Sequence, residues 1–240
     1  LHQVYGPHPA GNVGVQIGKI SPINAGERVW TVTPQDVATI GELFLTGKFN
    51  ATRTVALVGS EVKDAQYYNV ISGASIADLV AGKIEGDNVR VISGDVLTGT
   101  KVKMDGNLGF LSNTVTVIPE GNVYRMFGWM PFASPSVHSA SRTGLSWLMP
   151  GKKYAPNTNL NGEERALVVT GEMEAVMPLD IFPMQLLKAC LASDIDKMES
   201  LGIYEVAPED FALIDYTNTS KLEAQQIIRE ALDLMIKEVG

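Results

Sequence analysis

Residues 52–59 read TRTVALVG, an apolar run rich in β-branched residues that ends at a glycine. Such a run predicts a short β-strand. Similar short runs follow it, bounded by Gly, Asn and Asp: YYNVIS at 67–72, NVRVISG at 88–94, KVKM at 101–104 and TVTVIP at 114–119. One helical pattern, SIADLVAG at 75–82, interrupts them. Strands around a single short helix predict a compact α+β domain over residues 51–118, such as a β-grasp.

The preceding segment, residues 1–50, opens with the Gly- and Pro-rich run YGPHPAGNVGVQIGKISPINAG and continues with RVWTVT at 28–33, which predicts an apolar strand. A helix is expected next, with Thr33 as N-cap, Pro34 at the first helical position and Gly47 as its end. The spacing of three apolar residues predicts a buried stripe on this helix: Val37, Ile40 and Phe44.

Residues 119–171 show no repeating period and form a long, apolar and aromatic loop region. One aromatic and methionine cluster falls within 124–132, and Trp147, Leu148 and Met149 form a second. If exposed, such clusters indicate contact with a partner, a membrane surface or a flat apolar ligand; the alternative is that they cover the edge of the core. Cations flank both clusters. The candidate contact residues are Trp129, Phe132, Arg142 and Trp147.

Residues 172–240 carry helical patterns. Leu179, Phe182, Leu186 and Cys190 follow helical spacing, and a second helix is expected between Ser193 as N-cap and Gly202. The last helix is predicted to start at Ser220, because Glu223 follows three residues later as in a capping box. Its expected buried stripe is regular: Ala224, Ile227, Ile228, Ala231 and Met235.

Charge is unevenly distributed along the 240 residues, whose formal net charge is −8. Residues 172–240 contain 14 acidic and 5 basic residues, a net charge of −9. An acidic surface repels nucleic-acid phosphates, so a nucleic-acid role is rejected. This excess indicates a solvated helical surface or a docking face for a basic partner. No apolar run approaches the roughly 18 residues of a membrane span, so no transmembrane segment is expected.

Signatures of catalysis and cofactor binding are absent from the sequence. It contains neither a Walker phosphate loop nor a G-x-G-x-x-G run after a strand. The three histidines are scattered without metal-ligand spacing, and His138 lacks a nucleophile elbow among its neighbouring serines. The single cysteine, Cys190, excludes an internal disulfide and is expected to be a buried structural thiol. No catalytic, cofactor-binding or metal-ligating residue is therefore assigned.

Several motifs together are specific to one family: GPHPAGNVGVQIGKISP at 6–22, VWTVTPQDVATIGELFLTGKF at 29–49, GASIADLV at 73–80, RVISGDVLTG at 90–99 and GEMEAVMPLDIFP at 171–183. They closely resemble the A subunit of the Na+-translocating NADH:quinone reductase, in order and over essentially the whole chain. The part it resembles is the C-terminal half of that protein, which fits a chain that begins without methionine.

The resemblance implies a domain organisation. Residues 1–50 are similar to the end of a nucleotide-domain-like region, and 51–118 to a soluble-ligand-binding β-grasp domain. Residues 172–240 resemble an iron–sulfur domain, but the expected cluster loop, GIYEVAPEDFALIDYTNTSK at 202–221, contains no cysteine. An iron–sulfur cluster needs thiolates. Ile203, Phe211 and Leu213 are expected to fill the vacated space.

The resemblance also implies a role. It indicates a peripheral subunit on the cytoplasmic face of the bacterial inner membrane, which scaffolds the membrane subunits, especially the one with the quinone site, and contributes to quinone binding. The complex would use NADH, flavins, an iron–sulfur centre and ubiquinone, with none of the resident cofactors in this chain and no catalysis by the chain alone. Two alternatives stay open: a stand-alone β-grasp module that binds a quinone-like ligand without enzymatic role, and a free-standing flavin reductase, which would be yellow.

Overall fold

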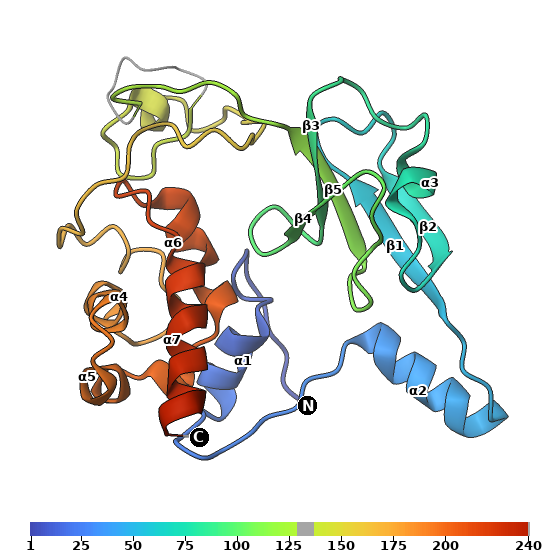
Figure 1. The fold of residues 1–240 in the computed structure, drawn as a ribbon, viewed down its shortest axis with the longest axis horizontal. Coiled ribbons are helices and arrows are strands. Elements are labelled where there is room, and N and C mark those ends of the chain that lie inside the picture. Colours follow the sequence, from blue (N-terminus) through green and yellow to red (C-terminus); the bar gives the residue numbers. More distant parts are fainter. Residues whose placement is uncertain (129–136, 240) are drawn as a thin grey trace. The chain divides into compact units, whose positions relative to one another are not determined.

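A computed structural model describes residues 1–128 and 137–239 of the chain, which form two compact units (Figure 1). The sheet unit comprises residues 31–123 and 153–159, and the helical unit comprises residues 1–30, 124–152 and 160–240. Among the helices that these ranges contain, none has the length and apolar character to cross a membrane. The predicted combination of a strand-rich part with C-terminal helices is confirmed.

The sheet unit is built on one five-stranded mixed sheet with the order β2-β1-β5-β3-β4. Its strands are β1 (Thr52–Val58), β2 (Gln66–Ile71), β3 (Val89–Ser93), β4 (Thr100–Val102) and β5 (Thr114–Pro119). The first strand pairs in parallel with the last and antiparallel with β2, whereas β3 is antiparallel to both β4 and β5. All five strands coincide with the predicted runs to within a few residues.

The core of this unit lies between the sheet and helix α3 (Ile76–Val80). Strand β1 alternates as expected for a half-buried strand, with Val55 and Leu57 fully buried. The Ser75 hydroxyl accepts a hydrogen bond from the N–H of Asp78 and caps α3. The buried residues come from both layers: Val55, Leu57, Ile76, Leu79, Val80, Val91, Leu108, Val115 and Val117.

Helix α2 (Pro34–Thr46) starts and ends as predicted, but its apolar stripe is not buried. The Thr33 hydroxyl accepts from the N–H of Asp36, and Gly47 ends the helix in the left-handed region at φ 71°. The side chains of Val37, Ile40 and Phe44 are exposed to 59%, 46% and 85%. The expectation of a buried stripe is wrong, because nothing among the described residues packs against that face.

The strand predicted at residues 28–33 is also wrong, since this segment is irregular. Val29, Trp30 and Val32 expose half or more of their side chains, with Trp30 at 91%. Apolar, β-branched composition favours extended backbone, but a strand also needs a neighbouring strand to pair its N–H and C=O groups. This segment forms no part of the described five-stranded sheet.

The helical unit packs short helices around α7 (Ala224–Glu238) (Figure 1). Its other elements are α1 (Val13–Ile20), η1 (Leu145–Leu148), α4 (Pro183–Leu191), α5 (Ile195–Ser200), η2 (Ile203–Glu205), η3 (Pro208–Phe211) and α6 (Ala212–Thr217). The stripe predicted for the last helix is confirmed at Ala224, Ile228, Ala231 and Met235, which are buried, while Ile227 is partly buried against the same core.

Helix starts in this unit differ from the predicted ones by a few residues. Phe182 precedes α4 and is 63% exposed, although it follows the spacing of the buried Leu186 and Cys190. Helix α5 is capped by Asp194, whose carboxylate accepts from the N–H of Lys197, rather than by Ser193. The last helix starts at Ala224 and not at Ser220, because the Asp215 carboxylate of α6 accepts a hydrogen bond from the N–H of Ala224.

Candidate docking surface

The structure describes Arg142 and Trp147 of the predicted contact residues, both in the helical unit. Trp129 and Phe132 lie in residues 129–136, outside the described ranges. Arg142 is exposed and occupies the turn that leads into η1, and Trp147 lies within η1 with 53% of its side chain exposed. These two are therefore adjacent parts of one surface feature.

A compact set of hydroxyl groups shapes the turn around Arg142. The Ser139 hydroxyl accepts from the N–H of Gly144 at 3.0 Å, and the hydroxyls of Ser141 and Thr143 lie 2.8 Å apart. Arg142 itself has φ 60°, an uncommon value for a residue with a side chain. The hydrogen bonds of its neighbours support this conformation, which leaves Arg142 at the exposed tip of the turn.

The 3-10 helix η1 has an inverted distribution of side chains. Ser146 is buried, and its hydroxyl accepts from the N–H of Ser139 at 2.9 Å. The apolar residues of the same segment are exposed: Leu145 to 45%, Trp147 to 53%, Leu148 to 57% and Met149 to 38%. The second apolar cluster is visible in the sequence, whereas the burial of Ser146 depends on its hydrogen bond with Ser139.

An aromatic contact attaches this segment to the helical unit. The rings of His138 and Tyr216 are stacked, with centroids 5.9 Å apart and an angle of 16° between their planes. Tyr216 belongs to α6, so the segment before η1 is held against the C-terminal helices. This role for His138 was not predicted, because residues separated by such a length of chain have no sequence signal of contact.

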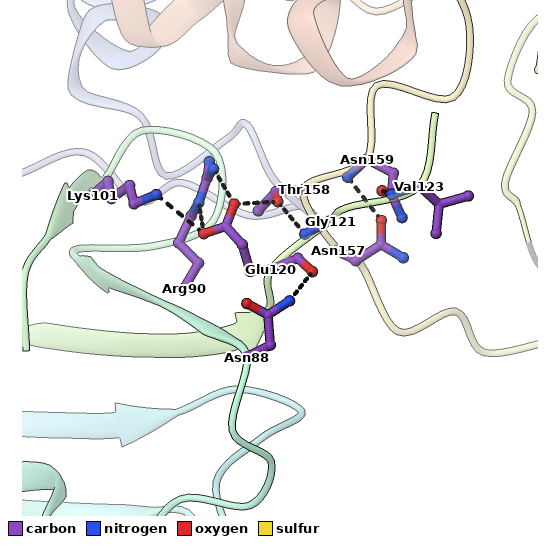
Figure 2. A network of polar contacts seen from close by, with 9 residues as sticks. All are labelled: Asn88, Arg90, Lys101, Glu120, Gly121, Val123, Asn157, Thr158 and Asn159. Carbon is purple, nitrogen blue, oxygen red and sulfur yellow. Dashed lines mark hydrogen bonds and ion pairs between the residues drawn. The ribbon is translucent and has the colours of Figure 1, made fainter. Parts of the chain in front are cut away.

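In the sheet unit, the long loop starts and returns at a polar network around Glu120, which follows β5 (Figure 2). The Glu120 carboxylate forms ion pairs with Arg90 and Lys101, the latter at 3.2 Å. The Thr158 hydroxyl donates to the same carboxylate at 2.9 Å. We call these four residues, with Gly121, the Glu120 clasp.

Backbone contacts complete the clasp. The N–H of Gly121 donates to the Thr158 hydroxyl at 2.6 Å, and the N–H of Val123 donates to the Asn159 side chain at 2.9 Å (Figure 2). A Cβ on Gly121 would lie 2.3 Å from the backbone nitrogen of Asn159, so only glycine permits this approach. The outgoing and returning chains are thereby joined at the C-terminal end of β5, the central strand of the sheet.

The electrostatics of the clasp follow from its geometry. Hydrogen bonds from Arg90, together with those from Thr158 and Lys101, outweigh the effect of burial and lower the pKa of Glu120 to about 2. The side chain is only 18% exposed. The role of Glu120 was not predicted from the sequence, because its partners Arg90 and Thr158 lie 30 and 38 residues away along the chain.

The interior of the segment 202–221 is filled by protein side chains. Ile203 and Phe211 are fully buried in the helical core, and Leu213 is partly buried. Asn218 is also fully buried; its amide donates to the carbonyl groups of Ile214 and Leu222 and accepts from the N–H of Leu222. The loop is thus closed by its own hydrogen bonds.

The described residues offer little that could hold a metal ion or a thiolate-bound cofactor. Among the described residues, no group of three or more His, Cys, Asp or Glu side chains is arranged to hold a metal ion. Cys190 is buried in the helical core, and this burial raises the pKa of its thiol to about 11. The prediction of a structural thiol is confirmed. A cleft of about 440 Å³ lies between α4 and α5.

Comparison with known proteins assigns parts of the chain to two related classes of domain. Residues 1–49 match the family described as the NqrA second alpha/beta domain, and residues 54–104 match the family described as the NQRA C-terminal domain. Over almost its whole length the chain is similar to the A subunit of the Na(+)-translocating NADH-quinone reductase of several bacteria. The resemblance found in the sequence motifs is confirmed.

The alignments cover nearly all of this chain but only about half of the length of each relative. The A subunit of Neisseria meningitidis serogroup B is 39% identical over 99% of this chain and 53% of its own length. That of Hahella chejuensis is 39% identical over 98% and 53%, and that of Vibrio campbellii 38% over 99% and 53%. The chain spans about half the length of the curated relatives it matches.

Proposed function

We propose that this chain is a non-catalytic, peripheral part of a Na+-translocating NADH:quinone reductase, on the cytoplasmic face of the bacterial inner membrane. It scaffolds the membrane subunits, above all the one that carries the quinone site, and the loop region contributes to quinone binding there. The observation that carries the proposal is similarity along nearly the whole chain to proteins named as the A subunit of this reductase.

The chemistry of the residues supports a scaffold rather than an electron carrier. An iron–sulfur cluster takes thiolate ligands, and the one cysteine of the chain is buried with a raised thiol pKa. Asn218 and Phe211 occupy the interior of the loop where cluster ligands are expected. The NADH, flavin, iron–sulfur and quinone chemistry of the complex then belongs mainly to the other subunits.

The sheet unit supports a finer domain assignment. A mixed sheet in the order β2-β1-β5-β3-β4, with a parallel pair of first and last strands and one short helix, has the arrangement expected of a β-grasp. Residues 1–50 then correspond to the end of a nucleotide-domain-like region. We assign docking to the loop region, with Trp129, Phe132, Arg142 and Trp147 as its contact residues.

Capture of the tagged chain by the detergent-solubilised remaining subunits tests the proposal. We expect capture that survives high salt, because an apolar contact is not screened by ions. Replacement of both Trp129 and Trp147 by alanine should weaken it, whereas Tyr67→Ala, at an exposed aromatic residue of β2, should not. Absence of capture at both low and high salt would contradict the scaffold role.

Visible absorbance separates this proposal from that of a free-standing flavin reductase. The purified chain should be colourless, and addition of a flavin should not produce a bound, yellow species. A flavin that co-purifies with the chain in equal amount would instead support a cofactor-carrying role.

A further inference from the structure

The 3-10 helix η1 buries its serine and exposes its apolar side chains. A short helix on a protein surface ordinarily turns apolar side chains inward and polar ones to water. Here Ser146 is only 7% exposed, while Trp147 and Leu148 each expose more than half of their side chains. This arrangement leaves apolar surface in water, at a free-energy cost that grows with the exposed apolar area.

Polar contacts, and not apolar burial, hold η1 in this orientation. The Ser146 hydroxyl accepts from the N–H of Ser139 at 2.9 Å and lies 3.4 Å from the Ser139 carbonyl oxygen, to which it donates. The N–H of Gly144 donates to the Ser139 hydroxyl. Because the serines are fastened inward, the apolar face is directed outward by the local structure itself.

The charges that flank η1 along the chain have one sign. Between Glu120 and Glu163 the sequence contains no acidic residue, although the whole chain has a net charge of −8. Within the helical unit, Arg142 lies shortly before η1 and Lys152 shortly after it. The N–H of Lys152 donates to the carbonyl oxygen of Met149. Arg142 and Lys152 are both exposed, so the exposed apolar segment is flanked along the chain by two cations.

Trp, Leu and Met flanked by Arg and Lys are the combination that enters the boundary between water and lipid. Tryptophan prefers the headgroup level, and long cationic side chains extend to lipid phosphates while their stems contact the acyl region. Lysine, by contrast, is depleted at protein–protein interfaces. The basic flanks of η1 therefore favour an anionic lipid surface over an acidic protein partner.

We infer that η1, with Arg142 and Lys152, rests on the anionic lipid surface beside the membrane subunits. This rests on the proposed function, because that role places the chain at a membrane. Residues 172–240 have a net charge of −9 and are repelled by the same surface, so the attraction comes from the basic segment around η1.

Co-sedimentation with vesicles tests the inference. The 240-residue chain should bind vesicles of phosphatidylcholine with phosphatidylglycerol and not those of phosphatidylcholine alone, and high salt should release it. Trp147→Ala with Leu148→Ser, or Arg142→Glu with Lys152→Glu, should lower the partition coefficient about tenfold or more. The matched controls, Trp30→Ala and Lys19→Glu with Lys48→Glu, alter exposed residues elsewhere and should leave binding near the wild-type level.

Fluorescence locates the contact independently. With Trp30 and Trp129 replaced by phenylalanine, the emission of Trp147 alone should shift to the blue on addition of the anionic vesicles. Binding that is equal for both kinds of vesicle, that is insensitive to the η1 variants, or that leaves the Trp147 emission unchanged would overturn the inference.

The two proposals can fail separately. Capture by the detergent-solubilised subunits without any binding to vesicles would overturn the lipid contact and leave the scaffold role intact, with a protein surface as the occupant of η1. Vesicle binding that is lost in the η1 variants, without capture by those subunits, would retain the lipid contact and contradict the proposed function.

Discussion

Asp215, in α6, accepts a hydrogen bond from the backbone N–H of Ala224 and thereby caps α7 from nine residues upstream. The same carboxylate accepts from the N–H and the side-chain amide of Gln225. The residue in the N-cap position, Glu223, makes no side-chain capping bond. The N-terminus of α7 is thus capped by a residue of the preceding helix, α6.

This contact predicts which substitution destabilises α7. Asp215→Ala removes the acceptor for two backbone donors and should lower the free energy of unfolding by about 2 kcal/mol. Glu223→Ala, at the residue that the capping-box pattern predicted, should change it by about 0.5 kcal/mol or less. Urea unfolding of both variants decides between them, and a larger loss for Glu223→Ala would contradict the assignment of the cap.

The Glu120 clasp predicts a specific pH dependence. The pKa of Glu120 is about 2 in the folded chain, below its ordinary value of 4.5. The unfolded chain therefore binds the proton first as pH falls. The stability that Glu120 contributes, up to about 3 kcal/mol, is present above pH 4.5 and is lost between about pH 4.5 and 2.

Unfolding measured across this pH range checks the clasp. Glu120→Gln should lose stability at neutral pH and show a shallower decline in acid. Thr158→Val, which removes one donor to the carboxylate, should shift the decline to higher pH, whereas Thr98→Val, whose hydroxyl bonds Asp95 in a separate turn, should not. Identical acid profiles for wild type and Glu120→Gln would contradict the shift.

Gly121 provides a steric test of the same region. Gly121→Ala places a Cβ 2.3 Å from the backbone nitrogen of Asn159, so the returning chain must move, at a cost of about 1–3 kcal/mol. Gly41→Ala is the matched control, since a Cβ there meets nothing within 4 Å and alanine favours the helix. Thermal unfolding should show a loss for the first variant and no loss, or a gain, for the second.

Cys190 should react slowly in the folded chain. Burial raises the pKa of its thiol to about 11 from 9.0, which reduces the thiolate population at neutral pH about a hundredfold. We expect alkylation to be slow in buffer and fast in urea, as followed by mass spectrometry. Rapid alkylation of the native chain would mean that α4 does not shield the thiol.

Local patterns in the sequence were sufficient for features that depend on neighbours along the chain. The strands, the Thr33 cap, the Gly47 stop and the buried stripe of α7 follow from residue periodicity and from backbone preferences that act within a few residues. The NqrA resemblance likewise rests on contiguous motifs, which similarity over almost the whole chain bears out.

The sequence was insufficient wherever the outcome depended on distant residues. Amphipathic spacing predicted helix α2 but not the exposure of Val37 and Phe44, because burial requires a facing element. The same spacing did not reveal that η1 turns Ser146 inward, which depends on hydrogen bonds to Ser139.

The sequence by itself determined the five strands of the sheet, the longest helices, the unequal distribution of charge and the family resemblance, since these are properties of short stretches and of composition. Only the tertiary structure decided that Asp215 caps α7, that Glu120 joins β5 to Thr158, and that η1 presents its apolar face to solvent. The physical reason is that a hydrogen bond or a buried surface needs two partners. Which groups become partners is set by how the chain folds back on itself.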